Sequence, residues 1–243
     1  MARQVLEISG SDAEKFLGDL VTNTLPAEGG LSYSALLSPQ GKYLFDFFLL
    51  HRGDALWVDV AKDRAQALGQ RLMMYRLRAD VTVKALDVDV AAGVFDPPAT
   101  AFVDPRDPAL GWRDYDGAAA EEIDMDALRV RHVIPESGVE LIPDESYILE
   151  MGFERLNGVD FKKGCYVGQE VTARMKHKTE LRKGLARVVL SQQVPAGTEV
   201  TAGGKPVGQV FTQSGGRGLA YLRFDRARGD MAAGDAKVQL DTT

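Results

Sequence analysis

The order of hydrophobic and polar residues at the start of the chain predicts a strand followed by a short helix. Apolar residues between Val5 and Ile8 indicate the strand. Four apolar residues then recur at i, i+3, i+4 and i+7, which places them on one helical face: Ala13, Phe16, Leu17 and Leu20. Ser11 and Glu14 are spaced as in a capping box, in which each side chain satisfies an unpaired backbone amide at the helix start.

Antiparallel strands and a second helix are expected next. The apolar pattern predicts strands at 32–37, 43–50 and 56–60, a helix from Asp63, and a further strand at 81–85. The second of these strands is the most apolar run, and it is far too short to span a bilayer, so we expect it to be buried. This succession of strands and helices is the signature of a split, ferredoxin-like α+β unit.

The rest of the chain changes character twice. Residues 96–117 hold four of the ten prolines and are expected to form a long surface connection. A helix at 125–131 restarts the α+β order. From about residue 185, short apolar runs separated by glycine-rich turns indicate a small closed barrel. We therefore expect an α+β domain of two subdomains at 1–182 and a β-barrel at 183–243.

The composition is that of an ordinary globular protein, with 45% hydrophobic and 26% charged residues. The net charge of -6 argues against general coating of nucleic acids. Segment 162–187 differs from this average, because its eight basic and two acidic residues give it a charge of +6. That segment is expected to meet an anion. Its basic residues are Lys162, Lys163, Arg174, Lys176, Lys178, Arg182, Lys183 and Arg187.

The few cysteine and histidine residues limit the possible metal chemistry. Cys165 is the single cysteine, which excludes an intrachain disulfide and a four-thiolate site built by one chain. His51, His132 and His177 are scattered, so no metal site is expected from them. The first residues lack the basic and apolar stretches of a secretory signal. Together with the lone cysteine, this predicts a cytoplasmic location without membrane attachment.

The segment Phe161 to His177, with the sequence FKKGCYVGQEVTARMKH, carries the clearest chemical signal. Cys165 follows two lysines and precedes a helix expected to begin near Gln169, and both features stabilise a thiolate. Gly164 and Gly168 allow the backbone to approach a ligand closely. A lone cysteine is also commonly a small buried apolar residue, and the glycines could serve turns only. The residue types alone leave both readings open.

The string KGCYVGQE, Lys163 to Glu170, closely resembles the signature of the YgfZ family, which is related to the glycine-cleavage T-protein, an aminomethyltransferase. The likeness extends over nearly the whole chain and is weak in the barrel. It includes a turn, a central hairpin, a later strand and two further turns: Thr22-Asn23, Tyr33 to Leu50, Met74 to Val83, Asp104-Pro105-Arg106 and Gly111-Trp112-Arg113. The resemblance implies a T-protein-like folate-binding fold of ferredoxin-like subdomains with a small C-terminal β-barrel.

The resemblance also implies a site for tetrahydrofolate or another folate. Glu150, in the string LEMG, matches the glutamate that holds the pteridine in T-protein relatives, whereas Glu154 four residues later is expected on a solvated face. Asn23 and most of the signature are implied as further contacts: Lys163, Gly164, Tyr166, Gly168, Gln169 and Glu170. Arg78, Lys163 and Arg174 are candidates for the anionic glutamyl tail. Tyr33, Phe47 or Tyr166 could provide flat walls for the ring.

The function implied is that of a folate-binding accessory protein in iron-sulfur cluster assembly or repair, whose clients include enzymes that thiolate transfer RNA. Cys165 would act in a site shared with a partner protein or as a redox thiol. The alternative is a folate-dependent one-carbon transferase that uses Asp46. It is less favoured because Phe45 stands where aminomethyltransferases tend to have a second acid. An RNA-binding role for the basic segment is least favoured, given the acidic remainder of the chain.

Overall fold

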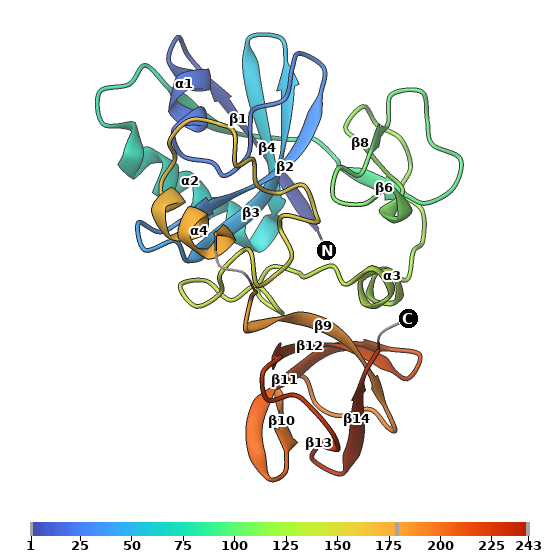
Figure 1. The fold of residues 1–243 in the computed structure, drawn as a ribbon. Helices are drawn as coiled ribbons and strands as arrows, with labels where there is room; N and C mark the ends of the chain where they lie inside the picture. The colour runs from blue at the N-terminus through green and yellow to red at the C-terminus, as the bar shows by residue number, and fades with distance from the viewer. Residues whose placement is uncertain (1, 178–179, 242–243) are drawn as a thin grey trace. The chain divides into compact units, whose positions relative to one another are not determined.

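The computed structural model describes residues 2–177 and 180–241 (Figure 1). Lys178, one of the basic residues expected to meet an anion, lies outside the described residues. The chain forms two compact units. The first comprises the chain up to Ile123 together with Pro143–Glu145 and Phe153–Ala173, and the second comprises Asp124–Ile142, Ser146–Gly152 and the chain from Arg174 onward.

The first unit is built on an antiparallel five-stranded sheet with the strand order β2-β3-β4-β1-β5. Its elements are β1 (Arg3–Ser9), α1 (Ala13–Gly18), β2 (Leu31–Leu37), β3 (Tyr43–Arg52), β4 (Ala55–Ala61), α2 (Lys62–Arg76) and β5 (Thr82–Leu86). The expected strands and both helices are present. As predicted, three strands separate the helices, one more than the ferredoxin-like pattern requires, because β2 adds an edge strand beside β3. The remaining order, β3-β4-β1-β5, is that of the predicted ferredoxin-like unit, so the α+β class is confirmed.

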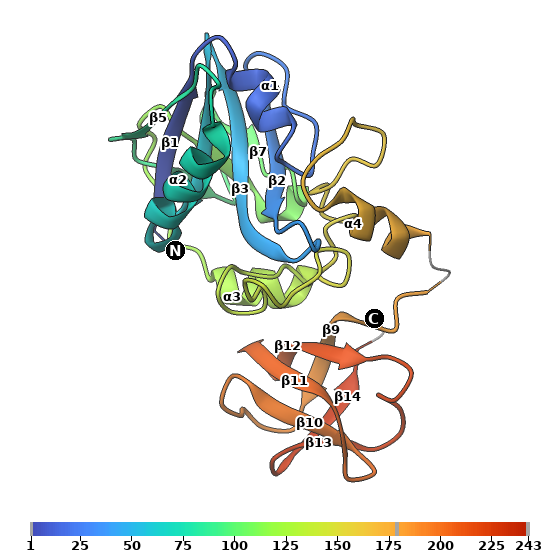
Figure 2. The ribbon, with the colours of Figure 1, turned by 90° about the vertical axis from the view of Figure 1, so that its left-hand side faces the viewer.

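Strand β3 is buried from Tyr43 to Leu50 because both faces of the sheet are covered (Figure 2). Phe45, Phe47 and Leu49 alternate along the strand and share one hydrophobic cluster with the buried faces of α1 and α2. The intervening side chains, Asp46 and Phe48, therefore point to the opposite face. This double burial explains why the sequence of β3 is a nearly continuous apolar run.

A layer of paired charges covers the opposite face, with Phe48 at its centre. The guanidinium of Arg113 lies 3.7 Å from the centroid of the Phe48 ring, and that of Arg106 lies 4.9 Å away. Asp104 pairs with both arginines, at 2.8 Å to Arg106 and 3.3 Å to Arg113. Asp59, opposite Phe48 on β4, accepts from Arg3, Arg113 and Tyr115. Each of these buried charges is thus paired with a group of the opposite charge.

This charged layer corrects the expectation of a surface connection at 96–117. The region instead contains a small three-stranded sheet of order β6-β8-β7, in which Asp104, Trp112 and Arg113 are buried. Its elements are β6 (Ala91–Gly93), β7 (Phe102–Val103), the 3-10 helix η1 (Pro108–Leu110) and β8 (Trp112–Asp114). Asp104 and Arg113 are buried because they pair with each other and with charged partners nearby, Arg106 and Asp59.

The capping box expected at α1 is not formed, which is a second correction. The N-cap residue is Asp12, and its side chain makes no cap hydrogen bond. Ser11 instead donates its hydroxyl to Asp80, 2.9 Å away, while Asp12 accepts from the backbone amide of Asp80. The polar residues before α1 therefore fasten the segment that enters β5. Leu20 lies beyond the helix end at Gly18 but is buried, as its periodicity suggested.

The second unit contains a closed six-stranded barrel of order β10-β11-β12-β9-β14-β13, which confirms the predicted barrel. Its elements are α3 (Met125–His132), β9 (Lys183–Leu190), β10 (Thr198–Ala202), β11 (Lys205–Ser214), β12 (Arg217–Arg223), β13 (Met231–Ala233) and β14 (Ala236–Leu240). The sequence pattern missed the three-residue strand β13. Arg129 of α3 pairs with buried Glu140, which accepts from Thr212 of β11 and so ties the helix to the barrel.

Across the described part of the chain, no helix has both the length and the apolar character needed to cross a bilayer.

The ion pairs of Asp104 provide a test of the charged layer. Burial alone would raise the pKa of Asp104, but its pairs with Arg106 and Arg113 outweigh burial and lower it. Because the folded-state pKa is lowered, this stabilisation is present above the ordinary aspartate pKa and is lost as the pH falls through the folded-state value. We expect Asp104→Asn to reduce the free energy of unfolding at pH 7 by about 3 kcal/mol, because Arg106 loses its charged partner and Arg113 loses one of its two.

Urea titration followed by tryptophan fluorescence measures this change, since Trp57 and Trp112 both lie in the first unit. The deficit of the variant should shrink as the pH falls below the ordinary aspartate pKa towards the lowered folded-state value, because protonation of the wild-type carboxyl removes the same charge. Asp63→Asn, at an exposed position of α2, is the control and should change stability little. A constant difference between wild type and Asp104→Asn from pH 7 to pH 3 would contradict the assignment.

Candidate functional site

Cys165 is exposed on a loop that precedes helix α4 (Gln169–Lys176). We call residues 161–168 the thiol loop. The helix begins at Gln169, as predicted, four residues after the cysteine. The alternative of a small buried apolar cysteine does not hold, because the thiol faces solvent. Contacts at both ends of the loop hold this exposed cysteine in a defined place.

Lys163 anchors the thiol loop to the end of helix α1. Its ammonium donates to the backbone carbonyl oxygens of Gly18 at 2.8 Å, Val21 at 2.5 Å and Asn23 at 3.1 Å. An ammonium has three hydrogens, and three carbonyls receive them. Burial lowers the pKa of Lys163 to about 8. The lysine that was expected to stabilise a thiolate or to bind an anion is therefore used to hold the loop.

Tyr166 and Gly168 fix the other end of the loop. The Tyr166 side chain is buried, and burial raises the pKa of its hydroxyl. Gly168 has φ +85° and packs so closely on the β2-β3 turn that a Cβ would lie 2.7 Å from the carbonyl oxygen of Ser38. Glycine is required at 168 for both reasons. The first turn of α4 is fastened by Thr172, whose hydroxyl donates to the Gly168 carbonyl at 3.3 Å.

The remaining residues of the signature differ in what they contact. Gln169 donates its side-chain amide to the carbonyl of Gly164 at 3.3 Å, which closes the loop around Cys165. Gly164 is exposed, and a Cβ there would meet no atom within 4 Å. Glu170 is exposed on α4. Most of the signature thus builds the loop, and its thiol faces solvent.

Asp46 lies on β3 in the first unit and is buried. Its two carboxylate oxygens accept from the hydroxyls of Tyr33 and Tyr43, each at 2.8 Å. Burial first, and then the charge of Asp46, raise the pKa of Tyr33 well above its ordinary value. Asp46 therefore orders two buried tyrosines, which is a structural use of the residue proposed to catalyse the alternative transferase reaction.

Asn23 is equally occupied by its surroundings. Its side-chain amide donates to the carbonyls of Tyr33 at 2.9 Å and Asn157 at 2.7 Å, and its oxygen accepts from the amide of Thr24 at 2.8 Å. These bonds join the turn after α1 to strand β2 and to the segment before the thiol loop. Of the suggested ring walls, Tyr33, Phe47 and Tyr166 are all buried.

Glu150 lies in the second unit, on a series of turns. Its Oε2 accepts from the hydroxyl of Tyr221 on β12 at 2.5 Å, and its backbone carbonyl accepts from Leu185 on β9 at 2.8 Å. Burial and this hydrogen bond raise the pKa of Tyr221. Oε1 has no partner within the described ranges. The carboxylate is thus half-buried, oriented, and able to accept a further bond.

Among the predicted tail contacts, Arg78 and Arg174 are exposed, on the turn after α2 and on α4 respectively.

Residues 2–177 and 180–241 contain no group of three or more histidine, cysteine or acidic side chains arranged to hold a metal ion.

Sequence reasoning missed several residues that order these sites. Tyr221 was not singled out, because no spacing links it to Glu150. Arg106 and Arg113 were noted only as parts of turns, although the strings DPR and GWR could have suggested paired charges beside Asp104. Arg3 gave no signal, since a basic residue at the start of a strand is usually exposed.

Comparison with known proteins places the chain in a family. The family model described as "CAF17, C-terminal beta-barrel domain" matches residues 182–242. The iron-sulfur cluster assembly factor IBA57, mitochondrial, of Mus musculus is 30% identical over 98% of this chain and 80% of its own length, and the Homo sapiens protein of the same name is 30% identical over 98% and 81%. The chain belongs to the family of IBA57 iron-sulfur cluster assembly factors.

The glycine cleavage system aminomethyltransferase T from Bartonella henselae has the same fold. It superposes with a TM-score of 0.74 over 99% of this chain and 83% of its own length, at 15% sequence identity. The T-protein-like fold is therefore confirmed. The resemblance to the YgfZ family is confirmed only at the level of the broader CAF17/IBA57 group. The predicted cytoplasmic location is wrong by this comparison, because the matched relatives are named as mitochondrial proteins.

Two glycines of the thiol loop provide a matched test of the geometry. Gly168→Ala should lower the free energy of unfolding of the first unit by about 1 to 3 kcal/mol, because alanine disfavours a positive φ and its Cβ would contact the Ser38 carbonyl. Gly164→Ala, four residues earlier, should change it little because the position is open. Urea unfolding followed by tryptophan fluorescence compares the two. Equal effects would show that the loop does not pack as described.

Proposed function

We propose that the chain acts in iron-sulfur cluster assembly by offering Cys165 as one ligand to a cluster that a partner protein also holds. The observation that carries this proposal is an exposed thiol, the single cysteine of the chain, on a loop anchored at both ends. Its relatives are named iron-sulfur cluster assembly factors. In this role the cluster is the cargo of the protein and not its resident cofactor.

The number of thiols decides how a cluster could be held. Clusters are bound by several protein ligands, commonly four thiolates, and this chain provides one. The remaining ligands must therefore come from a partner. A loop fixed by Lys163 and Gly168 presents its thiol with little loss of conformational freedom when the partner binds, which favours formation of a shared site. The resemblance to the YgfZ family adds enzymes that thiolate transfer RNA to the proposed clients.

A reduced folate is the proposed small-molecule ligand, with Glu150 as its pteridine-binding residue. A pteridine presents a ring N–H and an exocyclic amine on one edge, and a carboxylate can accept from both. Tyr221 fixes the orientation of Glu150 and leaves Oε1 available within the described residues. Exposed Arg174, which lies in the second unit with Glu150, is the proposed partner of the glutamyl tail. Folate binding also agrees with the aminomethyltransferase-like fold.

Replacement of the Cys165 sulfur by oxygen tests the role of the thiol. Cys165→Ser should abolish the support that the chain gives to maturation of an apo [4Fe-4S] enzyme in an extract depleted of the wild-type protein, because serine is a poor cluster ligand. The measurement is the enzyme activity recovered after each variant is added back. Because residue 165 is exposed, the urea midpoint of the variant should equal that of the wild type. Full recovery with Cys165→Ser would remove the thiol from the mechanism.

The folate proposal has its own test, independent of the thiol. Glu150→Gln should weaken tetrahydrofolate binding by about 2 kcal/mol, roughly thirtyfold in Kd, because the amide loses the charge-assisted pair with the pteridine edge. Glu154→Gln, at an exposed position nearby, should bind like the wild type. Anaerobic fluorescence titration measures both. Equal affinities for the three proteins would exclude Glu150 as the pteridine-binding residue and leave the thiol proposal unaffected.

A further inference from the structure

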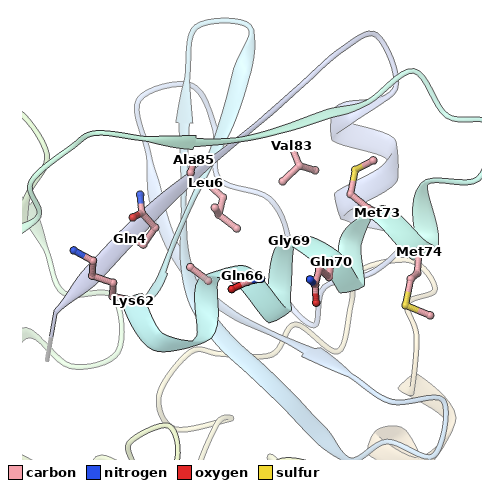
Figure 3. Close-up of a pocket in the computed structure, with 11 residues that line it drawn as sticks. Gln4, Leu6, Lys62, Gln66, Gly69, Gln70, Met73, Met74, Val83 and Ala85 are labelled. Carbon is pink, nitrogen blue, oxygen red and sulfur yellow. The ribbon is translucent and has the colours of Figure 1, made fainter.

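A groove lies on the first unit between helix α2 and the edge strand β5, well separated in sequence from the thiol loop. It has a volume of about 820 Å³ and is lined by Gln4, Leu6, Lys62, Ala65, Gln66, Gly69, Gln70, Met73, Met74, Val83 and Ala85. Small side chains at Gly69 and Ala85 leave the space between the helix and the strand open (Figure 3), and Ala65 also lines this space. None of the lining residues, all of them described, is acidic.

The groove has a distinct character at each end. Figure 3 shows Lys62 and Gln4 at one end and Met73 and Met74 at the other. The methionine end continues onto the surface, because Met73, Met74 and the following Leu77 are 43%, 70% and 86% exposed. Methionine is favoured at surfaces that adapt to a bound chain. Large exposed apolar side chains that cluster on one helix end are typical of an interaction site.

Charge favours an anionic occupant. Residues 62–86, which form α2 and β5, carry six basic and two acidic residues, a net charge of +4 in a chain whose total is -6. Lys62 is the charged residue of the lining and is exposed. An acidic group bound near Lys62 therefore meets a complementary field.

Polar groups along the groove favour a polypeptide over a lipid tail. Gln66 and Gln70 are exposed on α2, and their carboxamides offer both donors and acceptors, which a peptide backbone can satisfy and a hydrocarbon cannot. Strand β5 pairs with β1 on one side and is the edge of the sheet on the other, within the described ranges. A free edge next to a groove is suited to addition of an extended strand.

We propose that this groove docks an extended segment of a partner protein, with apolar side chains at alternate positions and an acidic residue near Lys62. The helix from Lys62 to Met73 rises roughly 16 Å, which an extended segment of about five residues spans. Side chains on one face of that segment enter the groove, while its backbone pairs with the free edge of β5. This docking site goes beyond the proposed cluster chemistry and does not depend on the thiol or on folate.

Gly69→Leu and Ala67→Leu form a matched pair for the test. A Cβ at Gly69 would be 4.0 Å from Leu6, an ordinary contact, so leucine there is tolerated and its side chain occupies the groove. Ala67 is exposed on α2 but does not line the groove. Leucine is a better helix former than glycine and nearly as good as alanine, so Gly69→Leu should melt no lower than the wild type and Ala67→Leu close to it.

The experiment selects random displayed heptapeptides on the wild-type chain, with counter-selection on Gly69→Leu, and then measures synthetic peptides by fluorescence anisotropy. We expect sequences that alternate apolar and polar residues and contain an acid. Their affinity for Gly69→Leu should be at least about tenfold weaker than for the wild type, and their affinity for Ala67→Leu should equal that for the wild type. Their affinity for Lys62→Gln should be about fivefold weaker.

Three outcomes would overturn the proposal. They are failure to recover peptides that depend on the open groove, recovery of predominantly basic peptides, and a wild-type dimer in sedimentation that Gly69→Leu dissociates. The last result would assign the groove to a second copy of this chain.

Discussion

The ammonium of Lys163 lies among three backbone carbonyl oxygens, one on the last residue of helix α1 and two just beyond it, and the position of the thiol loop depends on this contact. The carbonyls at a helix C-terminus lack partners within the helix, so a cation is favoured there. Because Lys163 meets this need from far along the chain, the segment before α4 is held beside α1. Gly168 then holds the other end against the β2-β3 turn, and Cys165 lies between two fixed points.

The chemical consequence is that the Cys165 thiol is exposed to solvent while its loop has little conformational freedom. A flexible cysteine would lose conformational freedom on coordination, whereas an anchored loop has already lost much of it in folding. The rest of the first unit helps to hold the thiol loop in place. The charged layer around Phe48 covers the second face of the sheet that contains β2 and β3. Asn23 is hydrogen-bonded to β2, and the turn at Gly41 connects β2 to β3.

Much of the fold could be predicted from the sequence, because periodicity reports burial directly. The strands of the first sheet, the helices from residues 13 and 62, and the barrel followed from apolar spacing. The region 96–117 could not be predicted in this way. Its side chains are polar and its prolines suggest a loop, yet Asp104 and Arg113 are buried because they pair with groups distant in sequence. Ser11 gave a false capping signal for a related reason, since its partner is Asp80.

The candidate site was only partly predictable. The signature around Cys165 indicated the right segment, but residue types could not separate anchors from reactive groups. Lys163 and Asn23 are typical ligand-binding residues, yet both are bonded to backbone carbonyls. Glu150 is oriented by Tyr221, a contact that spacing along the chain cannot reveal.

The central claim is that Cys165 becomes a cluster ligand in a site shared with another protein. Alkylation by iodoacetamide, followed by intact mass, measures this directly, because the chain has one cysteine and each addition is unambiguous. The chain is mixed anaerobically with a scaffold protein that carries a [2Fe-2S] cluster or with the same scaffold in its apo form. The account predicts protection of the thiol by the loaded scaffold only. Equal alkylation in both mixtures would contradict it.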